Sequence, residues 1–384
     1  MELILKQYDI PLLRFSATND SSTPEIEVHW INEDQRHLLP LDMELSPEGI
    51  SRWMRRRTIP RNRAYVNRLL AKCGLNANRP MGILALCKGL SVDDSYWVVE
   101  EGFEGTFEKY NLFENRFNEV LALIAFTGYG SSNRSSLASS PEFTTNGMLP
   151  KCWRRISGKV TLYKGGTDGG YNTGAEPYCE YYAAQVAAAM GIDAIPYGLS
   201  QWKGRLCSTC ELFTDIDHAY MPIGNLVQRG GFDAVAAYYE KLGEPFQKAF
   251  RDMLVFDAVI CNTDRHYGNF GFMIGNKNNT IAAPAPLFDH GNSLFNQAGP
   301  EDYESPEAFQ QYIDTLVPCV YDDFFATAKR FMADENREQL RKLLGFRFKR
   351  HVRYNLPPKR LKLMEEQVRK RAMRLLEKRI SLVF

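Results

Sequence analysis

The chain has 384 residues, 44% of them apolar, which is enough for a substantial core and for two or three domains. Its 47 basic and 46 acidic side chains nearly cancel, so no overall charge points to nucleic acid or to an anionic membrane. The eight cysteines are dispersed, the start is unlike a secretory signal, and no run of about 18 apolar residues occurs. These features predict a globular cytoplasmic protein without a membrane span, and a translocated effector would share them.

Residues 1–128 are predicted to form a separate accessory module of α/β structure. Short strand-like pieces come first, and a helical stretch, SRWMRRRTIPRNRAYVNRLLAKCGL, then runs to Gly74 before the apolar segment MGILALCKGL. For the arginines of this stretch, a solvated helix face is favoured over a contact with phosphate or an acidic partner. A Ser- and Gly-rich stretch at 129–142 has too little apolar surface to pack and is expected to be a linker.

The segment 143–215 is expected to be β-rich and to carry two cations. TTNGMLPK at 144–151 combines Gly147, whose backbone can approach an anion, with Lys151. This segment does not match GxxxxGK[ST], which disfavours a P-loop NTPase. GKVTLYK alternates like a strand, so Lys164 shares a face with apolar side chains and is the natural cation for the phosphates of a nucleotide.

A helix is predicted over EPYCEYYAAQVAAAMG, with Pro177 near its start and Gly191 at its end. Glu180 is the expected partner of Lys164, because burying an unpaired lysine is costly or removes its proton, and Glu176 is the alternative partner. RLCSTCELF is strand-like and contains a CxxC pair. A structural zinc site needs two more ligands and no second close pair follows, so ordinary strand residues are expected here.

Helices dominate from 216 to 384, and two loop segments with polar residues interrupt them. NTDRHYGNFG places Asp264 and Asn269 five residues apart, directly after the predicted helix AFRDMLVFDAVIC. Asp289 follows the apolar run PAPLF, which is expected to be a buried strand. Phosphoryl transfer needs an acceptor for a hydroxyl proton and oxygen ligands for magnesium, and these residues have that order and spacing. For His266 a structural hydrogen bond is favoured over proton transfer.

The C-terminal segment PKRLKLMEEQVRKRAMRLLEKRI is predicted to be a helix that packs on the large lobe. Its apolar residues recur at helical spacing, at Leu361, Met364, Val368, Ala372 and Leu375. Basic side chains cover the other face, where exposure to solvent is favoured over contact with RNA, an acidic protein or a membrane surface.

Taken together, TNGMLPK, the strand lysine, the helix around EYYAAQVAAAMGI, NTDRHYGNFG and PLFDHGNSL resemble the HipA-like serine/threonine kinases over roughly 140–340. The resemblance implies an α+β, bilobed protein kinase-like fold, with a small lobe at 143–215 and a large helical lobe at 216–384. It implies ATP and Mg²⁺ as cofactors. The roles that it implies are catalysis by Asp264, Asn269 and Asp289, magnesium binding by Asn269 and Asp289, phosphate binding by Lys164, Gly147 and Lys151 with Glu180 in support, and adenine binding by the backbone around Glu211, Leu212 and Phe213.

Regulation and partners follow only from the resemblance. In the family a serine of the phosphate loop can be autophosphorylated, which ejects the loop. Thr144 and Thr145 stand there in this chain, which puts such self-control in doubt. The family's toxins often pair with a separately encoded DNA-binding antitoxin, so an antitoxin-like partner is implied, whereas nothing in the chain indicates nucleic acid directly.

The leading hypothesis is an ATP- and Mg²⁺-dependent kinase that phosphorylates a serine or threonine of a protein, as a toxin or a regulatory enzyme. The D-R-H order is also similar to phosphatidylinositol kinases, which makes a lipid or small-molecule kinase the alternative enzyme. A nucleotide-binding interaction module without turnover is the alternative that is not an enzyme.

Overall fold

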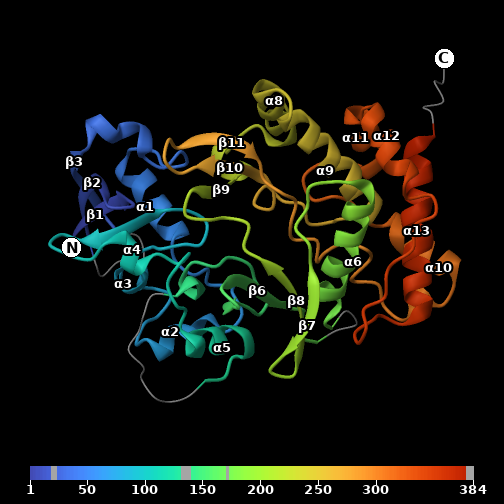
Figure 1. The fold of residues 1–384 in the computed structure, drawn as a ribbon, viewed down its shortest axis with the longest axis horizontal. Coiled ribbons are helices and arrows are strands. Elements are labelled where there is room, and N and C mark those ends of the chain that lie inside the picture. The colour runs from blue at the N-terminus through green and yellow to red at the C-terminus, as the bar shows by residue number, and fades with distance from the viewer. Residues whose placement is uncertain (19–23, 131–139, 170–172, 378–384) are drawn as a thin grey trace. The chain divides into compact units, whose positions relative to one another are not determined.

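The computed structural model describes residues 1–18, 24–130, 140–169 and 173–377 (Figure 1). Its contacts divide the chain into two compact units. Unit 1 comprises Met1–Lys164, Glu211–Met221 and Phe272–Ala282, and unit 2 comprises Gly165–Cys210, Pro222–Gly271 and Ala283–Phe384. The expected four-part division of the sequence stays a prediction.

An antiparallel sheet opens unit 1. Its strands are β1 (Glu2–Gln7), β2 (Ile10–Ala17), β3 (Ile26–Ile31) and β4 (Tyr96–Glu100), in the order β3-β2-β1-β4. Along β1 every second side chain is buried, so Leu3 and Leu5 enter a core that also contains Trp53 of the following helices. The alternating sequence therefore forms the short strands that it predicts.

The arginine-rich stretch forms two helices, α1 (Pro47–Arg56) and α2 (Val66–Lys72). Ser46 caps α1 by accepting the N–H of Gly49, and Pro60, which has no N–H to donate, lies in the break between the helices. The remaining helices of unit 1 are η1 (Glu33–Leu38), α3 (Pro80–Cys87), α4 (Phe107–Tyr110), α5 (Glu119–Thr127) and η2 (Pro141–Phe143).

The expected linker lies partly outside the described residues, since residues 131–139 are not among them. Its last residues contradict the expectation of an unpacked segment, because Ser140 and Glu142 are buried. Arg63 neutralises the charge of Glu142 in a buried ion pair, which explains how this polar stretch enters a core.

A β-hairpin of unit 1 carries both predicted cations. Strands β5 (Lys151–Ile156) and β6 (Lys159–Gly165) pair antiparallel around a two-residue turn, in which Ser157 and Gly158 both have positive φ. Unit 1 also contains most of a second sheet, ordered β11-β10-β9, formed by β9 (His218–Pro222), β10 (Gly271–Gly275) and β11 (Thr280–Pro284). Trp153 of β5 and Leu212 pack on the apolar cluster around Trp97, so the accessory module and the hairpin share one core.

Unit 2 is mainly helical. α6 (Ala175–Met190) ends at Gly191, whose φ of 78° forms a left-handed cap, as the sequence predicts. The hairpin β7 (Gly198–Trp202) and β8 (Arg205–Glu211) follows. The remaining helices are α7 (Ile223–Leu226), α8 (Gly231–Leu242), α9 (Phe246–Ile260), η3 (Glu301–Tyr303), α10 (Pro306–Asp314), α11 (Phe324–Phe331), α12 (Asp334–Arg341) and α13 (Pro358–Leu376).

The predicted C-terminal helix is confirmed as α13, which packs on α9, α11 and α12 (Figure 1). All five residues of its predicted apolar stripe are buried. Arg371 is buried with them and donates from Nε to the carbonyl of Ala258 in α9, 2.6 Å away. The buried face therefore includes a basic residue, Arg371, which lies three residues after Val368 and seven after Met364, next to the apolar stripe.

Candidate active site

The proposed catalytic loop begins where α9 ends. Cys261 adopts φ +54° and its N–H binds the carbonyl of Asp257, which closes the helix. Asn262 then turns the chain, since its Nδ2 donates to Asp257 Oδ1 at 3.0 Å and its Oδ1 accepts the N–H of Asp264 at 3.2 Å. The amide of Asn262 thereby fixes the position of Asp264 relative to the helix.

The carboxylate of Asp264 is held by a residue to which sequence reasoning gave no role. Asn292 Nδ2 donates to Asp264 Oδ2 at 2.8 Å, and Asn292 Oδ1 accepts from Asn296 Nδ2 at 2.9 Å. The N–H of Thr263 also binds the carbonyl of Asn292 at 3.1 Å. Asn292 follows Asp289 by three residues in HGNSL, so a polar side chain so close to the metal-binding candidate is the signal that could have identified it.

Asn269 and Asp289 present the oxygen atoms expected of magnesium ligands. Asn269 is buried and its Nδ2 points to the carbonyl of Asp264 at 3.4 Å, which directs the amide oxygen the other way. Asp289 has φ +57°, a conformation that L residues rarely adopt and that is concentrated at functional sites. Its N–H donates to the hydroxyl of Tyr197 at 3.0 Å. Burial and the neighbouring Glu180 raise the pKa of Tyr197 well above its usual value, so this hydroxyl stays neutral.

The apolar run before Asp289 is not the buried strand that we expected. Strand β11 ends at Pro284, and residues 285–288 have no regular structure apart from an isolated bridge between Ala194 and Leu287. The N–H of Leu287 binds the carbonyl of Asp193 at 3.0 Å. Two prolines in this segment remove N–H groups that a strand would donate, which explains the irregular path.

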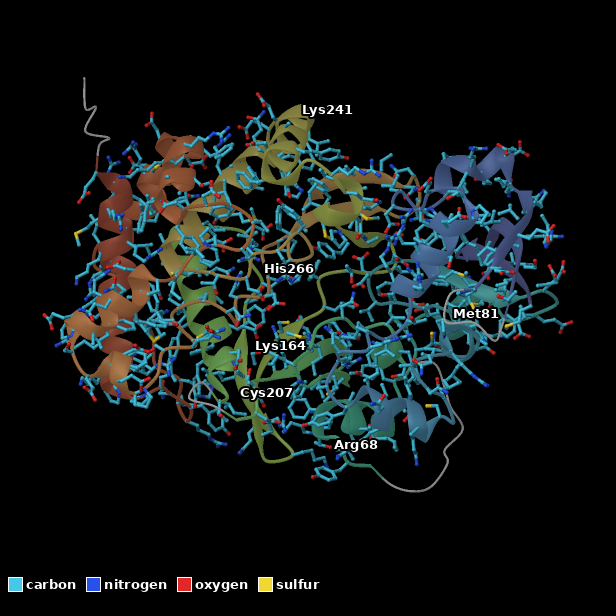
Figure 2. All side chains as sticks on the ribbon, turned by 180° about the vertical axis from the view of Figure 1, so that it is seen from behind. Arg68, Met81, Lys164, Cys207, Lys241 and His266 are labelled. Atoms are coloured by element: carbon cyan, nitrogen blue, oxygen red, sulfur yellow. The ribbon has the colours of Figure 1, made fainter. Side chains whose placement is uncertain are left out.

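Arg265 joins the two loops of unit 2. It is 1% exposed and makes a bidentate ion pair with Asp257, at 2.9 and 3.0 Å. Its Nη1 donates to the carbonyls of Asn269 and Phe288, at 3.1 and 2.7 Å, and its Nη2 lies 3.1 Å from Nδ1 of His290. One guanidinium therefore sets the backbone next to both proposed magnesium ligands. The neighbouring His266 is exposed and accepts the N–H of Gly268 at 3.0 Å, a bond within the loop (Figure 2).

Glu180 lies on α6 beside the segment that carries Asp289. It is fully buried, accepts a hydrogen bond from Ser208 Oγ, and lies close enough to Gly291 that a Cβ there would be 3.7 Å from its Oε1. Glu176, the alternative partner for Lys164, instead accepts both the N–H and the hydroxyl of Thr167. The pairing of Glu180 with Lys164 stays a prediction.

In unit 1 the two predicted cations are direct cross-strand neighbours. Lys151 of β5 lies directly opposite Lys164 of β6, which Figure 2 labels. Both residues are more than 90% buried. A Cβ on Gly147, whose φ is +92°, would lie 2.1 Å from Lys151 Nζ, so this lysine reaches back over the glycine. Two basic side chains on neighbouring strands would suit an anion with several negative charges.

The phosphate-loop threonines are both engaged. Thr144 Oγ1 donates to the carbonyl of Leu90 at 2.9 Å and is buried, and Thr145 Oγ1 donates to the carbonyl of Pro141 at 2.7 Å. Trp153 Nε1 also donates to Thr145 Oγ1 at 3.1 Å. Neither hydroxyl is presented as a free nucleophile, and self-control through the loop stays in doubt.

The segment proposed for adenine offers fewer groups than we expected. The side chain of Glu211 pairs with Lys159 Nζ at 2.7 Å, in solvent. The N–H of Leu212 already binds the carbonyl of Val160 at 2.9 Å. Adenine recognition would therefore depend on the carbonyl of Glu211 and the backbone of Phe213, and it stays a prediction.

A magnesium ion would need oxygen atoms from a ligand as well as from the protein. Across the described ranges, no group of three or more His, Cys, Asp or Glu is placed to hold a metal ion. The amide oxygen of Asn269 and the carboxylate of Asp289 are hard donors that fit magnesium, which usually completes its shell with phosphate and water. Cys207 and Cys210 of the CxxC pair lie on β8 and are not joined in a disulfide. No helix in the described part of the chain is long and apolar enough to span a membrane.

Comparison with known proteins identifies a curated relative and a solved structure of similar fold. No family model matches the chain. A curated relative, the serine/threonine-protein kinase CtkA of Helicobacter pylori, is 27% identical over 135 residues, which are 32% of this chain and 41% of CtkA. The chain thus matches less than half the length of this relative. The solved structure of HipA from Shewanella oneidensis, in complex with HipB and operator DNA, superposes over 97% of both chains with a TM-score of 0.52 and 14% identity.

The fold is HipA-like. The expected α+β kinase-like architecture and the resemblance of the sequence are confirmed at this level. A second solved structure, the proinflammatory kinase CtkA of H. pylori, covers 60% of this chain and 90% of its own, with a TM-score of 0.47 and 15% identity.

Proposed function

We propose that the chain is an ATP- and Mg²⁺-dependent kinase that transfers the γ-phosphoryl group to a serine or threonine of a protein. The observation that carries the proposal is the position of Arg265, which binds the carbonyls of Asn269 and of Phe288, the residue before Asp289, while Asn292 binds the carboxylate of Asp264. If Asp264, Asn269 and Asp289 only capped turns, no buried guanidinium would be needed to bind both loops.

In this proposal each residue has one task. Asp264, oriented by Asn292, accepts the proton of the attacking hydroxyl. Asn269 and Asp289 would hold magnesium, which neutralises the charge that develops on the phosphates. Lys151 and Lys164 would bind phosphate oxygens from the β5–β6 hairpin.

The relatives suggest a biological setting. The solved HipA is in complex with HipB and operator DNA. We propose that this chain also has a separately encoded antitoxin-like partner and acts as a toxin or a regulatory kinase. Purification of the tagged chain from its native cells would identify such a partner as a stoichiometric second protein.

The test of the reaction is phosphate transfer from γ-labelled ATP by the purified full chain. Asp264→Asn and Asp289→Asn should each lower transfer by about two to four orders of magnitude with an unchanged melting temperature. Asp334→Asn is the matched control, because that side chain is fully exposed, and it should retain activity. Undiminished transfer by both site variants would rule out the assignments.

Acceptors identify the substrate class in the same assay. We expect labelled serine or threonine in proteins and no labelled phosphoinositides. Labelled phosphoinositides would instead support the lipid kinase, and ATP binding without any transfer would support the interaction module.

A further inference from the structure

We propose that Arg63 is a positioning residue through which the accessory module, residues 1–128, sets the shape of the phosphate loop, residues 144–151. The inference rests on the proposed nucleotide-binding role of that loop. Arg63 lies in the break between α1 and α2 and is 2% exposed. The solvated face expected for the arginines is therefore wrong at this position and at Arg57, both of which are buried.

The guanidinium of Arg63 binds the chain before the loop, within it and at its last residue. Its Nη2 donates to the carboxylate of Glu142 at 2.5 Å and to the carbonyl of Lys151 at 2.9 Å. Its Nη1 donates to the carbonyl of Glu142 and, at 3.5 Å, to that of Thr145. The next residue, Ala64, donates its N–H to the carbonyl of Met148 at 2.9 Å. Two consecutive residues of the accessory module thus fasten the loop at Thr145, Met148 and Lys151, and also bind Glu142 just before it.

The chemistry of this contact requires arginine. Only a planar guanidinium offers several donors in one plane, enough for a carboxylate and three carbonyls at once. Burial raises the pKa of Glu142, and the charge of Arg63 opposes that shift. The second oxygen of Glu142 accepts the N–H of Trp153 at 2.8 Å, so the ion pair also fixes the start of β5.

Arg63 binds the backbone of the loop residue whose side chain is proposed to meet a phosphate. Arg63 binds the carbonyl of Lys151, and the side chain of the same lysine reaches over Gly147. The contacts described for Arg63 are all with the protein chain, and its buried position keeps it away from a bound phosphate, so its effect would be transmitted through the loop backbone. A ligand or partner that moves the segment between α1 and α2 would therefore change the affinity of the loop for phosphates.

The experiment measures binding of ATP and of adenosine to the full chain by titration calorimetry. Arg63→Lys keeps a positive charge beside Glu142 but loses the fork that holds the carbonyls of Thr145 and Lys151. We expect the Kd for ATP to rise about tenfold, because about two hydrogen bonds are lost, and the Kd for adenosine, which has no phosphate, to stay within about twofold. Arg57→Lys is the matched control. Arg57 is a buried arginine of the same module, pairs with Asp94 at 2.7 Å, and should leave both affinities unchanged.

Hydrogen exchange of the ligand-free chain gives a second readout. Faster exchange confined to residues 141–151 in Arg63→Lys, and absent in Arg57→Lys, supports the inference. An unchanged ATP affinity or an equal loss for ATP and adenosine overturns it, and so does unchanged exchange in the loop. If the unmodified chain binds no ATP, the proposed function itself fails, whereas ATP binding that is indifferent to Arg63→Lys refutes only the positioning role.

Discussion

Replacing Arg265 with methionine should separate the structural and catalytic tasks of the loop assembly. The side chains of Arg265 and Asp257 are 1% and 0% exposed. Removing the arginine leaves a buried carboxylate without its counter-charge, which costs about 3–5 kcal/mol. It also removes the donor from the carbonyls of Asn269 and Phe288, and a displacement of about 1 Å at a reacting group can cost about 100-fold in rate.

The double variant Arg265→Met/Asp257→Leu removes both charges. Asn262 loses one acceptor, at a cost of about 1–2 kcal/mol, and the carbonyls of Asn269 and Phe288 lose their donor, so only part of the stability should return. Activity should stay low, because the two carbonyls still lack their donor.

Hydrogen exchange of the α9 amides measures stability within unit 2 alone. The single variant should exchange roughly two to four orders of magnitude faster than the unmodified chain, and the double variant less so. Phosphate transfer from labelled ATP is measured on the same samples. Equal destabilisation of both variants would show that the ion pair is not the source of the stability, and restored transfer in the double variant would refute the role of the carbonyl contacts.

Two further substitutions test the phosphate loop and the catalytic loop separately. Gly147→Ala should weaken ATP binding by about 10- to 100-fold in calorimetry, because the new methyl would meet Lys151 Nζ. Gly158→Ala is the control: this glycine has a similar φ of +84° with open space around it, and its substitution should not change the affinity. Asn292→Ala should lower kcat by about 10- to 100-fold with an unchanged KM for ATP in steady-state assays, because it removes one hydrogen bond from the carboxylate of Asp264; a change in KM alone would contradict this.

Local patterns explain what the sequence predicts well. The buried stripe of α13 and the cap of α6 at Gly191 follow from helical spacing and from the conformational freedom of glycine. The alternation of GKVTLYK predicts β6 and the burial of Lys164, since strand periodicity is also local. The run before Asp289 is the exception, because its composition suggests a strand while its prolines prevent one.

The contacts that support the site are nonlocal, and no spacing rule reveals them. Arg63 binds residues 79 and 88 positions away, and Asn292 binds Asp264 across 28. The cross-strand pairing of Lys151 with Lys164 depends on the length of the turn at Ser157 and Gly158, which sets the register of the hairpin. The sequence therefore identifies the candidate groups, while their orientation depends on residues that look ordinary in the chain.

Arg63 in unit 1 and Arg265 in unit 2 both donate hydrogen bonds to the carbonyls of a loop. Each lies beside a loop whose carbonyls would lack partners inside the protein, and a buried carbonyl without a donor costs about 1–3 kcal/mol. Each also faces one buried carboxylate, Glu142 or Asp257, that neutralises its charge. A guanidinium paired in this way can donate to the carbonyls of irregular backbone, in the same way as backbone N–H groups donate to carbonyls in a helix or a sheet. The irregular loops at both proposed binding regions can therefore be ordered without secondary structure. Gly147 and Asp289 keep their positive φ and Asn269 keeps its side-chain direction, as the proposed binding of a nucleotide and its metal requires.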